Sequence, residues 1–229
     1  MPIRDTRYGK SRLALPTPLR IRLARALAAD TLATAVAVTG AGPPAGSGAV
    51  LAVVDTDHDA QLVRTVGARP VRSGGPGLSL AVATGLREVP AGARTAVLLA
   101  DVPAAHPADL VAVLDAVTDS NPVFLADTDG SGTTMVAGVD VGRPPRFGPD
   151  SARAHRAAGF RDLAAEGWNP TALRRDVDTL ADLAAVAPLL PPGSRTRRLL
   201  AEPAMRATLT VDAVETVGAL GAAPCRCYG

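Results

Sequence analysis

The stretch Thr95-Ala-Val-Leu-Leu-Ala-Asp101 decides the fold of this chain. Its apolar residues follow one another without alternating polar ones, which is typical of a strand buried on both faces of a parallel sheet. The run ends at Asp101, and Val102-Pro103 then turns the chain away. We therefore expect a buried strand with an acidic residue at its carboxyl end.

Strand-like and helix-like patterns alternate on both sides of this stretch. Short apolar runs predict further strands at residues 49–54, 123–126 and 135–139. Apolar residues spaced three or four apart predict helices, one through Leu19, Leu23 and Leu27 and others at residues 59–66, 78–86, 107–117, 151–158 and 179–186. This alternation predicts an α/β fold, with a mainly parallel (mixed) sheet covered by helices on both faces.

The composition excludes several classes of protein. With 47% hydrophobic and 20% charged residues, the chain resembles an ordinary globular protein. A net charge of +2 with scattered basic residues argues against nucleic-acid binding. No apolar run is long enough for a membrane span, and no signal peptide is recognisable. Cys225 and Cys227 lie too near the end to staple a core, so we expect a cytoplasmic protein.

The domain organisation is simple. A chain of 229 residues can form one α/β domain with a full core. The helix and strand patterns weaken from about residue 195 onward. We predict one domain over residues 1–196 and a tail or small appended element over residues 197–229, whereas the oligomeric state stays open.

Aspartates follow several predicted strands. Asp55, Asp101 and Asp127 each come directly after one. Ligands of an open parallel sheet bind beyond the carboxyl ends of its strands, and Mg²⁺ takes one or two carboxylates together with phosphate oxygens. The alternative is that each aspartate caps a following helix or turn. The pattern favours metal binding for Asp101, while for Asp55 the capping role is at least equally good.

A second acidic pair, Asp176 and Asp178, stands in Arg175-Asp-Val-Asp-Thr179. Side chains two residues apart on an extended segment point to the same side. We expect one of them, Asp178 ahead of Asp176, to share a metal with Asp101. The alternative is that Asp178 caps the helix that begins near residue 180.

Two nearby loops have the composition of anion sites. Gly130-Ser-Gly-Thr-Thr134 offers exposed main-chain N–H groups and two hydroxyls. Phe147-Gly-Pro-Asp-Ser151 follows, and Ser151 is placed to cap the next helix. Together these loops indicate that a carboxylate or a phosphate binds here.

Lys10 is the only lysine among 24 lysine and arginine residues. In a chain so rich in arginine, this lysine indicates a need for a compact ammonium, although chance survival is the alternative. No P-loop, no dinucleotide-binding glycine motif and no nucleophile elbow is present. The histidines His58, His106 and His155 are far apart in the sequence, which argues against a zinc site.

Several motifs, taken in order, resemble one known family, the guanylyltransferases of deazaflavin coenzyme F-420 biosynthesis. The resemblance covers roughly residues 2–196 and rests on Lys10-Ser-Arg-Leu13, Asp30-Thr-Leu32, Leu98-Leu-Ala-Asp-Val-Pro103, Gly130-Ser-Gly-Thr-Thr134, Arg146-Phe-Gly-Pro-Asp-Ser151 and Asp176-Val-Asp-Thr179. The family transfers GMP to 2-phospho-L-lactate in archaea and to phosphoenolpyruvate in actinobacteria. The composition, rich in arginine and alanine, favours phosphoenolpyruvate.

The resemblance also implies a fold and a set of site residues. The fold is a nucleotidyltransferase sheet, similar to that of molybdenum-cofactor guanylyltransferases and sugar-nucleotide synthases. Asp101 and Asp178, with Asp176 as a further candidate, look like ligands of Mg²⁺. The resemblance further implies that the phosphorylated acid is bound by Thr133, Thr134, Gly148 and Ser151. It implies that GTP is bound by Lys10, Gly77, Ser79 and Asp101.

Two features depart from the family's pattern. The nucleotide-contacting segment usually reads Leu-Asn, whereas here it reads Leu78-Ser79. The family also begins with a longer apolar strand, of which Met1-Pro-Ile-Arg4 supplies only a part. Either the natural start lies upstream of Met1, or the sheet tolerates a short first strand.

The expected reaction is attack by a phosphate oxygen of the acid on the α-phosphorus of GTP, with pyrophosphate leaving. 2-Phospho-L-lactate and 3-phosphoglycerate are alternative acceptors. A sugar phosphate or molybdopterin fits the two anion-type loops less well. An alternative from another class is a non-catalytic nucleotide-binding relative.

Overall fold

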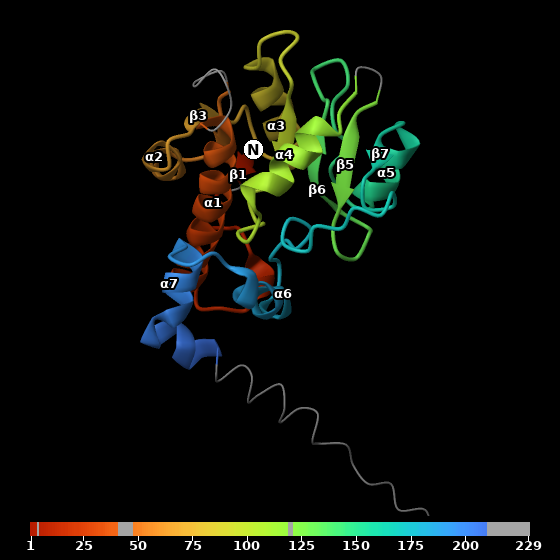
Figure 1. Ribbon diagram of the computed structural model, residues 1–229. Coiled ribbons are helices and arrows are strands. Elements are labelled where there is room, and N and C mark those ends of the chain that lie inside the picture. The colour runs from red at the N-terminus through yellow and green to blue at the C-terminus, as the bar shows by residue number, and fades with distance from the viewer. Residues whose placement is uncertain (4, 41–47, 119–120, 210–229) are drawn as a thin grey trace, which may run out of the picture.

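The computed structural model describes residues 1–3, 5–40, 48–118 and 121–209, and Figure 1 shows how they are arranged. Most of the glycine-proline loop predicted at residues 40–48 lies outside this part of the chain, as do Cys225 and Cys227. Within it, no helix is long and apolar enough to cross a lipid bilayer.

The strands form two groups. The first is a parallel sheet in the order β1-β2-β3, made of β1 (Pro2–Ile3), β2 (Leu51–Val54) and β3 (Arg69–Arg72). The second has the order β4-β6-β5-β7, made of β4 (Ala96–Leu98), β5 (Val123–Ala126), β6 (Thr133–Ala137) and β7 (Arg161–Asp162). β6 runs antiparallel to both of its neighbours, which makes the sheet mixed as predicted.

The antiparallel strand positions the site. Since β6 runs opposite to β4 and β5, its first residue, Thr133, lies at their carboxyl ends. Leu98 pairs with Met135 and Ala126 pairs with Thr133, with a register shift at Ala126. β6 thus begins at residue 133, two residues before the predicted start, and the predicted loop at 130–134 ends earlier. The threonines favour this extension because β-branched residues fit a pleated, half-buried surface.

Helices follow most strands, as the sequence predicts. They are α1 (Thr17–Gly40), α2 (Asp57–Thr65), α3 (Leu78–Arg87), α4 (Pro107–Asp115), α5 (Ser151–Ala157), α6 (Leu180–Val186) and α7 (Arg195–Ala201), with 3₁₀ turns η1 (Ser11–Leu13) and η2 (Ala187–Leu189). α1 contains the motif Asp30-Thr-Leu32 of the family resemblance and continues beyond it to Gly40.

Helices cover both faces of the second sheet. Leu98, Leu125 and Met135 point to one face, where they pack with α4. Their strand neighbours, such as Phe124 and Val136, point to the other face, where α3 and α5 pack. This division follows from the alternation of side chains along a strand.

The C-terminal end of the described chain joins the core. α7 spans the boundary predicted at residue 196, and Leu199 is buried in the same cluster as Leu23 and Leu27 of α1. The carboxylate of Asp30 accepts hydrogen bonds from the main-chain N–H groups of Arg195 and Thr196, at 2.9 and 2.7 Å. α1 therefore anchors the first turn of α7, so part of the expected tail is integral to the domain (Figure 1).

Candidate active site

Asp101 lies just past the carboxyl end of β4. Its main chain continues the strand's pairing, because Leu99 N–H donates to Thr134 at 3.0 Å. The Asp101 carbonyl then accepts from Val177 N–H at 3.1 Å. This bond lays the segment around Val177 beside the strand end, 76 positions away in sequence (177 − 101).

Asp176 and Asp178 flank Val177 on this segment. Val177 is fully buried, so the side chains on either side of it turn the other way. Carboxylate oxygens of Asp101, Asp176 and Asp178 lie within 4.8 Å of one another. The alternative role for Asp178 is wrong: Thr179 caps α6, in a capping box with Asp182, which leaves Asp178 available to the acidic cluster.

Lys10 reaches this cluster from the N-terminal segment. Its Nζ lies 2.5 Å from Oδ2 of Asp101 and 2.7 Å from Oδ1 of Asp178. The Lys10 backbone is left-handed, with φ of 58°, which is uncommon for a residue with a side chain. Arg20 fixes the preceding residue by donating to the Gly9 carbonyl at 2.6 Å, and buried Leu13 anchors the following turn. Strained backbone of this kind tends to occur at functional sites.

The charges of the cluster act on one another. Burial alone would lower the pKa of Lys10, but the carboxylates of Asp101 and Asp178 outweigh it and raise that pKa above its usual value. Burial, together with the negative charges of Asp101 and Asp178, raises the pKa of Asp176 to about 7. Asp176 therefore holds a proton more readily than an ordinary carboxyl group, while Lys10 stays charged.

The cluster suits a hard cation. Oδ1 of Asp101 is buried and has no hydrogen-bond partner among the described residues. A buried carboxylate oxygen without a partner is costly, and a cation would satisfy it. Carboxylate oxygens are ligands that Mg²⁺ prefers. The residues present therefore fit a magnesium ion. In this structure the ammonium of Lys10 contacts two of the same carboxylates, those of Asp101 and Asp178.

A polar cavity of about 500 Å³ opens onto this cluster. Its other walls come from the N-terminal segment, α1 and the start of α3, and include Gly9, Ser11, Arg12, Asp55, Gly77 and Leu78. Gly77 precedes α3 with φ of 105°, a conformation that favours glycine. Ser79 is exposed on the first turn of α3 and is not one of the residues lining this cavity.

The other two strand-end aspartates have different partners. The carboxylate of Asp127 accepts from Ser131 N–H at 3.1 Å and from Gly132 N–H at 2.8 Å, so it stabilises the glycine-rich turn. Asp55 accepts from Asp5 N–H at 3.3 Å, and the three-carboxylate cluster does not include it. For Asp127 the capping interpretation is the better one, whereas Asp55 contributes to the cavity wall.

The residues expected to bind the acid form a separate cluster. Oγ1 of Thr133 lies 3.1 Å from Oγ of Ser151 and 3.0 Å from Nδ1 of His155, and all three side chains are buried. The expectation that Ser151 caps α5 is wrong, because Asp150 occupies the cap position and Ser151 is the first helical residue. Gly148 is exposed in the preceding loop, with φ of 143°.

Thr134 faces away from that cluster. Its hydroxyl points to the Leu125 carbonyl of the neighbouring strand, at 3.5 Å. Successive residues of a strand point to opposite faces, so Thr133 and Thr134 cannot turn their side chains to the same ligand. None of Thr133, Thr134, Gly148 and Ser151 lines the polar cavity.

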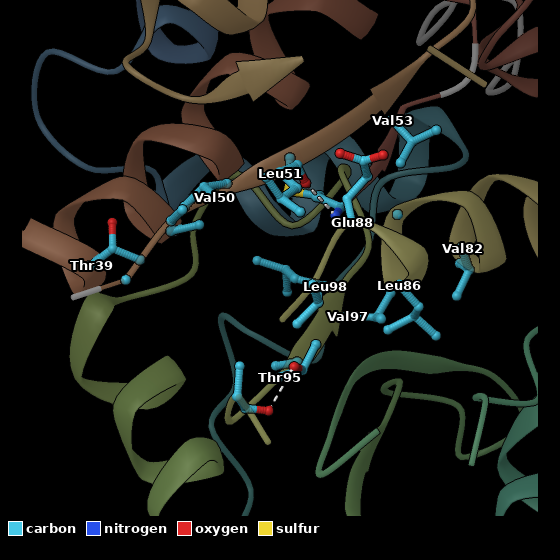
Figure 2. A pocket seen from close by; sticks show the side chains of 18 of the residues that line it. Thr39, Val50, Leu51, Val53, Val82, Leu86, Glu88, Thr95, Val97 and Leu98 are labelled. Carbon is cyan, nitrogen blue, oxygen red and sulfur yellow. Dashed lines mark hydrogen bonds between the residues drawn. The ribbon is translucent and has the colours of Figure 1, made fainter. Parts of the chain in front are cut away.

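A larger cavity, of about 740 Å³, lies between β2 and β4. Figure 2 shows side chains around it from β2 (Leu51, Val53), from β4 (Val97, Leu98) and from α3 (Leu86). This cavity is next to the two-residue β1, which pairs with β2 only at Val53 and Val54. Its lining is mainly apolar, and none of the predicted site residues is part of it.

Two positioning residues were missed by sequence reasoning. Arg174 donates to the carbonyls of Ala126 and Asp127, at 2.9 and 2.5 Å, and so links the 174–178 segment to the end of β5. His155 packs one helical turn after Ser151, and that spacing of four residues was a usable signal. For Arg174 no local pattern distinguishes it from the chain's many other arginines.

The fold, with a polar cavity beyond the carboxyl ends of its strands, is that of a nucleotidyltransferase. A solved structure from Desulfovibrio desulfuricans, assigned as a nucleotide-diphospho-sugar transferase, matches it with a TM-score of 0.57. The match covers 93% of this chain and 94% of that chain at 12% identity, so it concerns the fold alone.

Sequence relatives are more specific. Phosphoenolpyruvate guanylyltransferase of Thermomonospora curvata is 39% identical over 208 residues, which cover 88% of this chain and 87% of that protein. The Streptomyces avermitilis enzyme of the same name is 40% identical over 200 residues, covering 82% and 87%. The chain belongs to the phosphoenolpyruvate guanylyltransferase family and is therefore a guanylyltransferase. No family model matches it.

Proposed function

We propose that this guanylyltransferase transfers GMP from GTP to phosphoenolpyruvate and releases pyrophosphate, in the presence of Mg²⁺. We assign the reaction to coenzyme F-420 biosynthesis in the cytoplasm. Relatives of this name at 34–40% identity support the acceptor. 2-Phospho-L-lactate and 3-phosphoglycerate are the alternative acceptors, since both also carry a carboxylate and a phosphate.

One observation carries the proposal: an ammonium and three carboxylates meet at the wall of the polar cavity. Lys10 contributes the ammonium, and Asp101, Asp176 and Asp178 contribute the carboxylates. A nucleotide triphosphate needs cations along its phosphates, and this wall can hold both a metal and a lysine. The start of α3 at Gly77 adds main-chain N–H groups, which no side chain caps, and such groups bind phosphate.

The reaction balances without a protein nucleophile. A phosphate oxygen of phosphoenolpyruvate forms a bond to the α-phosphorus of GTP, and the bond from that phosphorus to the α,β-bridging oxygen breaks. Pyrophosphate leaves with the electron pair. The attacking oxygen is already anionic, so no general base is required. The barrier comes mainly from bringing two anions together in line.

The residues of the cavity lower this barrier by charge and by position. Asp101 and Asp178 would hold Mg²⁺, which offsets the phosphate charge when it is bound. Lys10 lies within reach of the same phosphates and remains protonated. With those carboxylates holding Mg²⁺, the Lys10 ammonium would contact a phosphate oxygen in place of Asp101 and Asp178. Asp176, whose pKa is raised to about 7, is the third candidate ligand.

Pyrophosphate release tests the proposal. The purified chain is incubated with GTP and Mg²⁺, and each of the three acids is offered separately. Release with phosphoenolpyruvate, and none in the presence of a chelator, is the expected result. Release with only another acid would correct the acceptor. A folded protein that binds GTP but releases no pyrophosphate with any of the acids would contradict the proposal.

A further inference from the structure

We propose that His155 is a positioning residue for the acid acceptor, which fixes the direction of the Thr133 hydroxyl and the course of the loop before α5. The inference rests on the proposed function, because Thr133, Gly148 and Ser151 are the residues expected to bind the acid. The inference adds His155 to the acid site and explains which groups donate and which accept hydrogen bonds in that site.

His155 is enclosed by protein. Its side chain has no exposed surface, and the rings of Phe124, Phe147 and Phe160 lie 5.2, 5.6 and 5.3 Å from its own. Both ring nitrogens nevertheless have polar partners. Nε2 lies 2.8 Å from the N–H of Arg146, and Nδ1 lies 3.0 Å from Oγ1 of Thr133. A buried imidazole with two directed contacts has one orientation.

The contact with Arg146 determines the position of the imidazole proton. A main-chain N–H can only donate, so Nε2 accepts and carries no hydrogen. Burial lowers the pKa of His155 to about 4, so the ring is neutral near neutral pH. The hydrogen of the neutral ring is therefore on Nδ1, and His155 donates it to Oγ1 of Thr133, 3.0 Å away. A hydrogen bond between His155 and the main chain of Ser151 acts on the pKa in the opposite sense to burial, which outweighs it.

This proton position determines how the hydroxyls point. Since Oγ1 of Thr133 accepts from His155, its own hydrogen must be directed elsewhere. Thr133 and Ser151 have one hydroxyl hydrogen each. One of these two hydrogens forms the 3.1 Å hydrogen bond between their oxygens. The other remains available to donate. Carboxylate and phosphate oxygens only accept, so they are the ligand groups that this chain of donors matches.

The same imidazole holds the neighbouring loop. By accepting from Arg146 N–H, His155 ties the start of Arg146-Phe-Gly-Pro-Asp150 to α5. Gly148 is part of this loop, and a second bond, from Ala152 N–H to the Ser131 carbonyl at 3.0 Å, ties α5 to the glycine-rich turn. His155 thus joins two loops assigned to the acid. It does not line the polar cavity that is assigned to the nucleotide.

Three variants separate the contacts of His155 from its bulk. His155→Leu removes both hydrogen bonds. His155→Asn places an amide N–H near the former Nδ1 and restores the donor to Thr133. Phe160→Leu is the matched control, because it loosens the same aromatic enclosure without changing either hydrogen bond. Melting temperatures verify that each protein is folded.

The expected result is a change confined to the acid. His155→Leu raises the KM for phosphoenolpyruvate about tenfold or more and leaves the KM for GTP within about twofold, because the Thr133 hydroxyl is no longer directed and its hydrogen bond to the charged acid is weakened. His155→Asn recovers most of the loss. Phe160→Leu melts at a lower temperature but keeps both KM values. An unchanged acid KM in folded His155→Leu, or an equal rise for GTP, would overturn the inference.

Calorimetry keeps the inference separate from the proposed reaction. Binding of phosphoenolpyruvate, 2-phospho-L-lactate and 3-phosphoglycerate is measured directly on the wild type and on the three variants. A wild type that binds an acid without turnover would refute the proposed function, while weaker binding by His155→Leu would still support the role of His155. Equal binding by wild type and His155→Leu, or no binding of any acid, would refute that role.

Discussion

The two cavities of this protein border the same strands, β2 and β4, at different positions along them. The polar cavity meets residues that follow the strands, such as Asp55 and Asp101. The larger, apolar cavity meets residues inside them, such as Leu51, Val53 and Leu98. Volume is therefore a poor guide to chemistry in this fold, since the strand residues around the larger cavity are mainly apolar while the strand ends supply charged side chains.

The two cavities also differ in what destabilises the protein around them. Burying like charges is unfavourable: burial raises the pKa of Asp176, and repulsion from the charges of Asp101 and Asp178 raises it further. Lys10 offsets that repulsion through two short contacts. The apolar cavity costs packing energy instead, because its walls lack dispersion partners. Substitutions around the polar cavity should therefore change activity, and substitutions around the apolar cavity should change stability.

The largest expected effect is at Asp101. Asp101→Asn should lower turnover on the order of 10³-fold, because the proposed metal ligand, whose Oδ1 has no partner among the described residues, loses its charge. Melting temperature should change little, since the amide keeps the shape of the side chain. Steady-state pyrophosphate release measures the rate. Normal turnover by the folded variant would remove Asp101 from the mechanism.

Lys10 should have the next largest effect. Lys10→Met should reduce turnover on the order of 10²-fold, because it removes the ammonium that we propose contacts the phosphate oxygens. The carboxylates of Asp101 and Asp178 then lose the ammonium that bridges them, and Arg12 remains near Asp178 at 3.8 Å, so Mg²⁺ should raise the melting temperature more than it does in the wild type. Lys10→Arg is the control for charge alone. An identical response of Lys10→Met and wild type to Mg²⁺ would contradict this account.

The pH dependence of stability sharpens the comparison at Asp176. Its pKa is about 7 in the folded protein and near 3.8 in the unfolded chain, so between these values the folded state retains a proton that the unfolded state has released. This group therefore lowers the free energy of unfolding as pH rises from about 4 to 7, by about 2 kcal/mol after allowance for solvent screening.

Asp176→Asn should remove that part of the pH dependence, as measured by urea unfolding across this range. Asp129→Asn is the control, because Asp129 is an exposed carboxyl group on the same side of the molecule. If Asp176→Asn and wild type have parallel stability curves between pH 4 and 7, the carboxyl group does not carry a raised pKa.

The smallest effect is expected in the apolar cavity. Ala35 of α1 lines it, and Ala35→Leu places a larger apolar side chain against the empty space. The free energy of unfolding should rise by about 1 kcal/mol, which is typical of cavity filling. Turnover should stay the same, because no candidate site residue lines this cavity. A loss of activity at unchanged stability would show that the two regions are coupled.

Much of the architecture could be predicted because it depends on local pattern. The strand at residues 123–126 has the predicted bounds, and α3 and α5 end within one residue of theirs. Asp101 and the pair Asp176 and Asp178 were identified because strand ends and a spacing of two are visible in a sequence. The strand-end rule accounts for Asp101 alone, whereas the convergence of the three carboxylates within 4.8 Å depends on the hydrogen bond that lays Val177 beside Asp101.

Contacts between distant segments were decided by the tertiary structure alone. The sequence itself determined the α/β class, the order of the elements and the acidic residues at the strand ends, since periodicity and turn residues specify these over a few neighbours. It did not determine that Lys10 lies between Asp101 and Asp178, that Asp30 holds α7, or that His155 donates to Thr133. Each of these contacts depends on how packed elements bring remote side chains within about 3 Å, and no local pattern encodes that distance.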